Sequence, residues 1–411
     1  MKQKDAIKIL KKGHNAFITG AAGSGKTFLA EKFVKWSRSK GKVVAVTAST
    51  GIAATHLNGT TVHSWSGIKI HQTLTDKEIK KMMRKDYLRE HIRHSDILVI
   101  DEISMLHSFQ LDLINKVCKI FRQDVRPFGG LQVVLSGDFF QLPPVKGSGF
   151  GSYVVNASAW SELDLQICYL TDQYRHQDTK FITLLNNIRQ ANCTPSDIEL
   201  LQSKVDAKLK TKIKPVKIYT HKRDVDSLNT IELSKIDERP YTYQARSKGL
   251  THLIKQLQAN CLAPEELMLK KGAVVMFVKN NFNEGYINGT MGIVEDFDDD
   301  EYPIVKTASD KIINVRPASW TVEEHDEKLA EIKQLPLRLA WAITIHKSQG
   351  MSLDLTEIDL SKSFEYGMGY VALSRVRSLD GLRLLGFNTM ALRVDPKVTK
   401  LDREFSSTSA M

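Results

Sequence analysis

Short apolar runs alternate with longer amphipathic stretches over residues 15–160. The runs NAFIT, VVAVT, ILVID and LQVVLSGD have the length and the β-branched content of buried strands. Between them, the stretch from Phe109 to Phe121 carries its apolar residues at helical spacing. Apolar strands separated by helices are typical of a parallel sheet that is covered on both faces. The pattern therefore predicts a first α/β domain.

The same alternation returns in VKIYT, LPLRLAWAIT, DLTEIDLS and GLRLLGF, which predicts a second α/β domain. Between its parts lie shorter strands with Gly, Asn and Asp turns, namely GAVVMFVKN, TMGIVEDF, YPIVKT and KIINVRPASW. Such a run of short strands favours a small β-barrel inserted near residues 268–330. We expect the first domain at 1–165, the second at 166–267 and 331–403, and a disordered tail at 404–411.

A basic stretch, KIHQTLTDKEIKKMMRKDYLREHIRHS, interrupts the first domain at about residues 67–95. Its pattern predicts mainly helix. Two interpretations stay open, an arm that lies over DNA and a solvated helical face.

The composition narrows the class of protein. The 411 residues allow two to four domains, and a hydrophobic content of 42% predicts a folded core. Lys and Arg number 58 against 47 Asp and Glu, and the net charge of +11 favours a polyanionic partner such as nucleic acid. The four cysteines lie far apart, no apolar run reaches membrane-spanning length, and the N-terminus lacks a signal-peptide core. We expect a soluble cytoplasmic protein, associated with the nucleoid if it is bacterial.

The stretch GAAGSGKT, residues 20–27, fits the phosphate-binding pattern G-x-x-x-x-G-K-[ST]. Its glycines let successive N–H groups surround a phosphate chain, while Lys26 reaches the outer phosphates and the Thr27 hydroxyl binds Mg²⁺. A predicted strand precedes the loop and a predicted helix follows it, which is the context the motif requires. The expected nucleotide-binding residues of the loop are Gly20, Gly23, Ser24, Gly25, Lys26 and Thr27. The implied cofactors are ATP and Mg²⁺.

Two further stretches follow predicted strands. In DEIS, Asp101 would hold Mg²⁺ through water, and Glu102 would orient and deprotonate the attacking water. In GDFFQLPP, the uncharged Gln141 can hydrogen-bond a γ-phosphate or the lytic water. A nucleoside kinase does not need a water-activating glutamate, whereas a hydrolase does.

With the remaining motifs, the chain resembles a superfamily 1B helicase, and specifically the Pif family of DNA helicases. The shared blocks include TASTGIAATHLNGTTVHSWSGI, LTDQYRHQDTKFITLLNNIR, YINGTMGIV, LAWAITIHKSQGMSLD and YVALSRVRSLDGL, in family order from Gln3 to Phe387. The resemblance implies two RecA-like P-loop domains with an SH3-like insertion in the second. One departure is Met368, an apolar residue where the family often has glutamine. The long extensions of eukaryotic members are absent, so we expect a compact bacterial or phage type.

The resemblance also implies the roles of single residues. Arg175 in QYR and Arg375 in LSR match the two arginine fingers, both from the second domain, and Gln3 matches the adenine-reading glutamine. ATP is therefore expected between the domains, so that domain closure couples hydrolysis to movement. Gly350 is a further expected ATP-binding residue. The implied catalytic residues are Lys26, Asp101, Glu102, Gln141, Arg175 and Arg375.

For DNA, the resemblance points to short polar and basic side chains, which suit phosphate and sugar contacts. They are Thr50, His63, Ser64, Thr220, His221, Thr344, His346 and Lys347. Trp65, Phe139 and Phe140 suit stacking on unpaired bases and burial in the core equally well.

The function implied is that of an ATP-dependent 5′→3′ DNA helicase of replication, recombination, repair or telomere-type maintenance. Its expected partners are single-stranded DNA and forked duplexes, with G-quadruplexes and RNA–DNA hybrids as further substrates, and it is expected to act as a monomer. Three alternatives stay open: a DNA-stimulated ATPase that translocates without separating strands, a P-loop kinase, and a non-catalytic DNA-binding module. The complete set of catalytic residues argues against the last.

Overall fold

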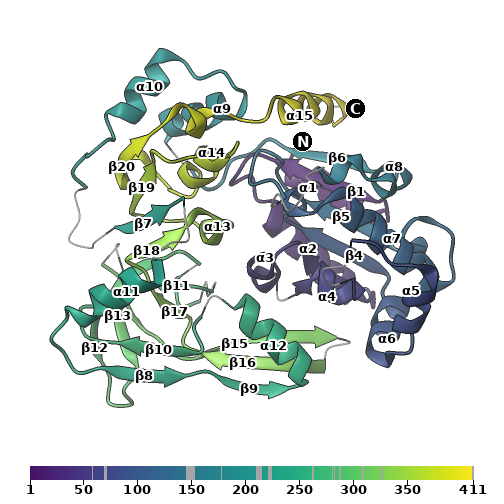
Figure 1. The fold of residues 1–411 in the computed structure, drawn as a ribbon, viewed down its shortest axis with the longest axis horizontal. Coiled ribbons are helices and arrows are strands. Elements are labelled where there is room, and N and C mark those ends of the chain that lie inside the picture. Colours follow the sequence, from purple (N-terminus) through teal and green to yellow (C-terminus); the bar gives the residue numbers. More distant parts are fainter. Residues whose placement is uncertain are drawn as a thin grey trace. The chain divides into compact units, whose positions relative to one another are not determined.

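A computed structural model gives the fold and divides the chain into two units. One unit comprises Met1–Tyr174, Val322–Leu329 and Lys400–Met411, and the other comprises Arg175–Thr321 and Ala330–Thr399. Figure 1 shows the elements of both units, and each unit is described here by itself. The residues described are 1–57, 59–68, 72–144, 153–176, 178–209, 215–220, 225–261, 263–279, 281, 283–286, 288–307, 310–324 and 327–409.

The first unit contains a six-stranded sheet in the order β3-β2-β4-β5-β1-β6, in which every pair of neighbours is parallel. The prediction of a parallel α/β domain is thus confirmed. Its central strands are buried on both faces, which explains their continuous apolar sequences. The strands are β1 (Ala16–Gly20), β2 (Val44–Ala48), β3 (Thr60–Thr61), β4 (Ile97–Asp101), β5 (Gln132–Ser136) and β6 (Gln166–Leu170).

Helices pack on this sheet. On one face, α1 and α2 bury residues such as Ile7 and Phe33 against Ile18 and Val99. Phe17 alternates with Ile18 along β1, so its ring lies on the opposite face. The helices are α1 (Gln3–Lys11), α2 (Lys26–Ser39), α3 (Gly51–His56), α4 (Val62–Ser66), α5 (Asp76–Met82), α6 (Asp86–His94), α7 (Ser108–Arg122) and α8 (Ser158–Glu162).

Because it includes the edge strand β6, the first unit ends later in the sequence than predicted. Residues 166–170 were expected to open the second domain, but β6 pairs with β1 over its whole length. The unit accordingly continues to Tyr174. Parallel pairing is non-local, so the sequence around residue 166 does not indicate which sheet the strand joins.

A helix near the end of the described residues corrects the predicted disorder for residues 404–409. The helix α15 covers Pro396–Thr408. Its Phe405 ring packs 5.2 Å from the ring of Phe17, and its Asp402 accepts a hydrogen bond from the Tyr169 hydroxyl at 3.0 Å. Apolar burial and a buried polar contact together order this segment, although its Ser- and Thr-rich sequence suggested a loose tail.

The basic insert forms α5 and α6, as its pattern predicts. The Thr75 hydroxyl and the Glu78 carboxylate cap the first turn of α5 reciprocally. Basic side chains line a hollow on α5 beside Glu78; they are Lys77, Lys80, Lys81 and Arg84. Both interpretations of the insert, DNA arm and solvated face, remain predictions.

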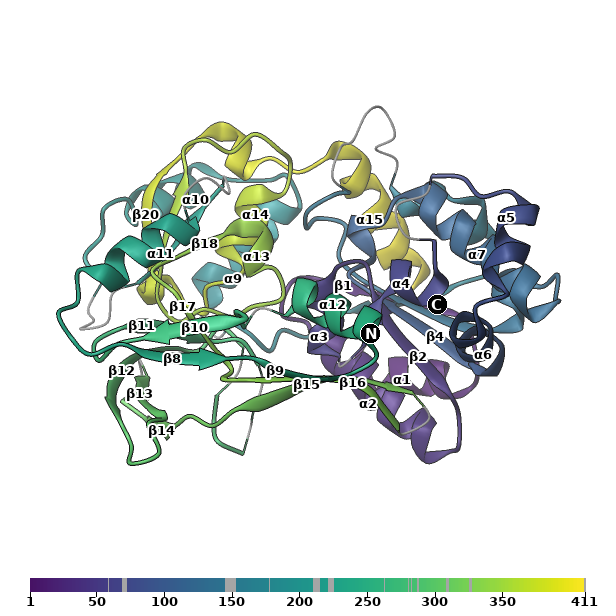
Figure 2. The same cartoon turned by 60° about the horizontal axis from the view of Figure 1, so that its bottom comes forward.

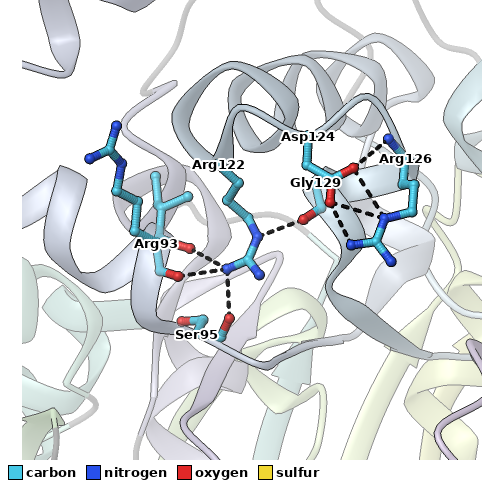
Figure 3. Close-up of polar contacts among 7 residues, drawn as sticks. Arg93, Ser95, Arg122, Asp124, Arg126 and Gly129 are labelled. Carbon is cyan, nitrogen blue, oxygen red and sulfur yellow. Dashed lines mark hydrogen bonds and ion pairs between the residues drawn. The ribbon is translucent and has the colours of Figure 1, made fainter.

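One guanidinium joins the insert to the helix α7 (Figure 3). Arg122, at the end of α7, donates to the carbonyls of Gly129 at 2.6 Å and Ser95 at 2.7 Å. It also donates to the carbonyls of Arg93 at 2.8 Å and Ile92 at 3.0 Å. A single side chain thus satisfies the carbonyl groups at the end of α6, which have no helical partners.

The second unit contains a four-stranded sheet in the order β18-β7-β19-β20, again with parallel neighbours. This confirms the second predicted α/β domain. Its strands are β7 (Val216–Tyr219), β18 (Ala342–Thr344), β19 (Thr356–Leu360) and β20 (Leu382–Phe387). Its helices are α9 (Thr179–Arg189), α10 (Pro195–Gln202), α11 (Val225–Ser234), α13 (Ile345–Ser348) and α14 (Met368–Leu373).

Antiparallel strands form the predicted insertion and extend past both ends of 268–330. Five of them form a sheet in the order β14-β13-β12-β11-β17: β11 (Val274–Phe277), β12 (Met291–Phe297), β13 (Pro303–Thr307), β14 (Ile312–Asn314) and β17 (Leu337–Leu339). The others are β8 (Tyr241–Gln244) with β10 (Glu266–Leu269), and β9 (Arg246–Gly249) with β16 (Glu327–Gln334) and β15 (Ala318–Glu324). Figure 2 shows the long strands β15 and β16, and the helix α12 (Thr251–Asn260) belongs to the same region.

The predicted strand LPLRLAWAIT is divided between two sheets. Its first part, β17, pairs antiparallel with β11, and its second part, β18, pairs parallel with β7. Residues 340–341 between them carry the chain from the insertion back to the parallel sheet. Among the described residues, no helix is both long enough and apolar enough to cross a membrane.

Candidate nucleotide site and nucleic-acid-binding residues

The phosphate-binding loop connects β1 to α2, as the motif requires. Gly20, Gly23 and Gly25 all have positive φ, and Gly25 is the N-cap of α2 in the left-handed conformation. The Lys26 ammonium donates to the carbonyls of Gly20 at 2.9 Å and Ala21 at 3.1 Å. The loop therefore turns back over its own lysine at the N-terminus of α2, the end of a helix that favours negative charge.

Gln3 lies beside this loop. Its side-chain amide donates to the carbonyls of Ser24 and Gly25, each at 3.3 Å. A Cβ on Gly25 would stand 2.2 Å from the Gln3 amide nitrogen, so the contact requires glycine there. The structure therefore places the predicted adenine-reading residue next to the phosphate loop, although the two are far apart in sequence.

Tyr174 is a neighbour of the loop that the sequence analysis missed. Its backbone N–H donates to the Gly23 carbonyl at 2.9 Å, and its ring is 60% exposed. A Cβ on Gly25 would lie 3.4 Å from this ring and next to Gln3, so the ring and the amide lie near one another. An exposed aromatic face is suited to stacking on a planar base. The sequence feature that could have identified Tyr174 is its position directly before Arg175 in the QYR motif.

Asp101 ends β4 within hydrogen-bond distance of the first turn of α2. The Thr27 hydroxyl donates to its carboxylate at 3.3 Å, and the Glu102 N–H donates to the other oxygen at 2.9 Å. Burial raises the pKa of the Asp101 carboxyl, against the opposing effect of the Glu102 amide and the Lys26 charge. A buried carboxylate beside a hydroxyl is a suitable oxygen donor set for Mg²⁺.

Glu102 adopts a left-handed backbone conformation, with φ of 51° and ψ of 45°. This conformation is uncommon for a residue with a Cβ, and such strain is concentrated at functional sites. The Ser49 hydroxyl donates to the Glu102 carbonyl at 2.6 Å and so helps to hold it. The side chain is half-buried, and it stands at the carboxyl end of the sheet, where α/β folds place their ligands.

Gln141 belongs to a tight turn after β5. Its N–H donates to the Asp138 carbonyl at 3.0 Å, and the Phe140 N–H donates to the Asp138 carboxylate at 3.2 Å. A Cβ on Gly137 would meet the Ile103 side chain at 2.8 Å, so glycine lets this turn approach the segment that carries Glu102. The structure thus brings the two motifs together at one edge of the sheet.

Arg175 and Arg375 converge within the second unit. Arg175 donates to the Ser374 carbonyl at 3.1 Å. Arg375 is 1% exposed and donates to the Ser374 hydroxyl at 2.8 Å and to the Val371 carbonyl at 3.0 Å. His176 lies against the same backbone, at Ser374 and Val376. The two predicted arginine fingers therefore share one support, the end of α14.

In the first unit, the residues predicted to bind DNA cluster around α3 and α4. The Thr50 hydroxyl accepts from the Ala53 N–H at 3.3 Å at the start of α3, and Ser64 lies in the first turn of α4. Burial lowers the pKa of His63, and a hydrogen bond with Gln110 opposes this shift. Thr50, His63 and Ser64 are half-buried, so their DNA contacts remain predictions.

In the second unit, Thr220 follows β7 and Thr344 is the last residue of the neighbouring strand β18, and both are largely buried. Gly350 is exposed with φ of 78°, just after α13. His221 lies outside the described residues, as do the side chains of His346 and Lys347. Met368, where the sequence departs from the family pattern, is fully buried in α14.

The three aromatic candidates are buried, which decides between their two interpretations. Phe139 and Phe140 are 5% and 3% exposed, and Trp65 is 7% exposed with its ring 5.9 Å from that of His91. Phe139 packs against Phe17 at 5.5 Å. A base cannot stack on a ring whose faces are already covered, so in this structure these side chains belong to the core.

These features define a P-loop nucleoside triphosphatase: a phosphate loop, an acidic pair at the end of a parallel strand, and a polar turn beside it. Residues 2–199 match the model of the PIF1-like helicase family, and residues 252–297 match that of the DNA helicase Pif1 2B domain. The second match begins before the predicted insertion at 268–330.

The chain is similar over its whole length to known helicases. It is 41% identical to the ATP-dependent DNA helicase Pif1 of Psychrobacter, covering all of this chain and 71% of that protein. It is 36% identical to the ATP-dependent DNA helicase PIF1 of Xenopus laevis, covering 97% of this chain and 63% of that protein. The chain belongs to the PIF1-like helicase family, and it is an ATP-dependent DNA helicase.

Solved structures support the same family. A Bacteroides Pif1 in complex with ADP-AlF4 has a TM-score of 0.85 and 31% identity, covering 98% of this chain and 96% of that one. Bacteroides Pif1 has also been solved with ADP-AlF3 and single-stranded DNA, with a TM-score of 0.68 and 32% identity at the same coverage. A further Pif1 structure, with a TM-score of 0.67, 32% identity and the same coverage, describes unwinding of forked duplex DNA by two coordinating helicases.

Proposed function

We propose that the protein moves 5′→3′ along single-stranded DNA and separates the strands of forked duplexes, using ATP and Mg²⁺. The observation that carries the proposal is the distribution of the hydrolysis residues. Lys26, Asp101 and Gln141 belong to the first unit, while Arg175 and Arg375 belong to the second. Neither unit alone holds the full set, so we propose that hydrolysis requires residues of both units.

The residues suggest a division of labour. Lys26 and the loop N–H groups bind the phosphates, and Glu102 takes the proton of the attacking water. Arg175 and Arg375 neutralise charge that develops on the γ-phosphate. The Thr27 hydroxyl and the Asp101 carboxylate would hold Mg²⁺, which supplies charge neutralisation at the phosphates when bound. Within the described residues, no three His, Cys, Asp or Glu side chains gather to bind a metal. Mg²⁺ needs only one or two protein oxygens besides phosphate and water.

Tyr174 and Gln3 are proposed to bind the adenine, one by stacking and the other by hydrogen bonds. The half-buried polar residues Thr50, His63 and Ser64 are proposed to contact the sugar-phosphate backbone, which carries no sequence information. The net charge of +11 supports such a partner. A single chain carries every motif, so we propose that one copy suffices for translocation.

The test combines phosphate release with strand displacement. Single-stranded DNA should stimulate ATP hydrolysis, and Lys26→Ala should abolish hydrolysis while leaving single-strand binding largely intact. A duplex with a 5′ tail should be unwound, and one with a 3′ tail should not. Unwinding from the 3′ tail would refute the direction. Stimulated hydrolysis without displacement on either substrate would identify a translocase that does not separate strands.

A further inference from the structure

The helix α15 contributes an aromatic ring to the core of the first unit. The Phe405 ring lies 5.2 Å from Phe17 and 6.2 Å from Trp160, and it stacks on Phe139 at 6.1 Å with an interplanar angle of 26°. Phe405 is buried, and the four rings contact one another in every combination. The cluster therefore joins four separate segments of sequence.

Two polar contacts hold the same face of α15. The Tyr169 hydroxyl donates to the Asp402 carboxylate at 3.0 Å, and the Tyr169 N–H donates to the Ser409 hydroxyl at 3.1 Å. Asp402, Phe405 and Ser409 are spaced three and four residues apart, so they lie along one side of the helix. Both contacts are made by the edge strand β6. The segment from Asp402 to Ser409 is thus docked at defined points on the unit that carries the phosphate loop.

The partner of Phe405 lies inside a catalytic motif. Phe139 stands two residues before Gln141, in the turn that the Gln141 N–H closes onto the Asp138 carbonyl. Phe139 also contacts Phe17 of β1, the strand that leads into the phosphate loop, at 5.5 Å. The contacts of the Phe139 side chain therefore hold this turn against the core, and Phe405 covers part of that side chain.

We propose that α15 is a positioning element of the nucleotide site, in which Phe405 holds Phe139 and thereby fixes Gln141. The inference rests on the proposed function, because it concerns the residue that contacts the γ-phosphate or the lytic water. Phe405 does not touch the nucleotide and acts through Phe139. The chain reaches α15 from the second unit, since Ala330–Thr399 belong to that unit and Lys400–Met411 to the first. The segment that connects the units thus also supports the catalytic turn.

A purely structural role for Phe405 predicts a different result from a positioning role. Loss of packing alone lowers the stability of the first unit and reduces all activities through the folded fraction. Loss of positioning lowers kcat while leaving KM for ATP in place, because Lys26 and the loop still bind the phosphates. The effect of a Phe405 substitution on kcat also disappears when Gln141 has already been replaced, because substitutions of two residues that act as one unit are not additive.

The experiment measures DNA-stimulated hydrolysis by Phe405→Ala with and without Gln141→Ala. Phe405→Ala should lower kcat about tenfold with little change in KM, since small displacements of a catalytic group are costly. In the Gln141→Ala background the same substitution should change kcat less than about twofold. Equal reductions in both backgrounds would overturn the proposal. Arg403→Ala, at an exposed position on the same helix, is the matched control and should behave as wild type.

Two further measurements cover the case in which Phe405→Ala folds poorly. Phe405→Leu keeps an apolar side chain but lacks the ring that stacks on Phe139, so kcat should fall, by a smaller factor than in Phe405→Ala. Hydrogen exchange of the full-length protein without nucleotide needs no activity, so its result is separate from the proposed function. Phe405→Leu should speed exchange at residues 137–141 and leave residues 20–27 unchanged, relative to Arg403→Ala. Equally faster exchange over both segments would show that Phe405 contributes only to packing and does not position the turn.

Discussion

The Thr27 hydroxyl donates to the Asp101 carboxylate at 3.3 Å, which joins the first turn of α2 to the end of β4. The two residues come from separate motifs, and each follows a buried strand of the same parallel sheet. Their contact places the phosphate loop and the acidic pair in one site. Glu102, the residue after Asp101, donates its N–H to the Asp101 carboxylate and so lies at the same edge of the sheet.

Glu102→Gln tests this arrangement. The amide has the shape of the carboxylate but cannot accept the proton of the attacking water, so kcat should fall about 10²–10⁴-fold. Affinity for a fluorescent ATP analogue should change little, because the phosphates are bound elsewhere in the site. Glu90→Gln, at a half-exposed position on α6, is the control. Wild-type hydrolysis by Glu102→Gln would remove this residue from the mechanism.

The arginines of the second unit should act on turnover. Arg175→Ala and Arg375→Ala should each lower kcat at least about 10³-fold, as expected for residues that stabilise charge only in the transition state. KM for ATP should change much less. Arg383→Ala removes an arginine that pairs with Glu357 and Asp206 in the same unit and should leave kcat unchanged. If Arg175→Ala or Arg375→Ala raises KM for ATP and leaves kcat unchanged, the assignment of that residue as an arginine finger is contradicted.

Arg122 should be a determinant of stability (Figure 3). Its guanidinium satisfies four backbone carbonyls, and Arg122→Ala should lower the free energy of unfolding of the first unit by about 2–4 kcal/mol. Arg126, four residues later, is exposed and pairs with Asp124, so Arg126→Ala should have little effect. Urea denaturation compares the two. Equal losses of stability would show that the carbonyl contacts do not matter.

His176 should make stability depend on pH. Burial lowers the pKa of His176 to about 4, and the charge of Arg175 acts in the same direction. Because the folded pKa is below the unfolded value, the unfolded chain takes up the proton first, and stability is lost as pH falls from about 6.5 towards 4. Between pH 7 and pH 5 the loss should be about 1–2 kcal/mol.

His176→Gln should remove that part of the loss, as measured by urea denaturation at the two pH values. His94→Gln replaces an exposed histidine and reports the effect of losing a histidine as such. If His176→Gln leaves the difference between pH 7 and pH 5 unchanged, another group accounts for it.

Much of the nucleotide site could be predicted from sequence because each motif is local. Lys26, Asp101 and Gln141 each follow a run of apolar residues that forms a strand, and the carboxyl ends of parallel strands meet at one edge. Tyr174 was missed because its contact with the Gly23 carbonyl joins residues far apart in the chain. The antiparallel insertion extends past its predicted limits of 268–330 for a similar reason. Its strands β8 and β9 pair with β10 and β16, which are not adjacent to them in the sequence.

The sequence by itself determined the two parallel α/β cores, the phosphate loop and the membership of a helicase family, because strand–turn–helix units and their glycines are encoded over a few neighbouring residues. Only the tertiary structure decided that Phe139 is a core residue and that residues 396–408 form a docked helix. An aromatic side chain suits a base and a core equally well, and burial depends on what covers it. For Phe139 part of that cover is Phe405, which lies far from it along the sequence.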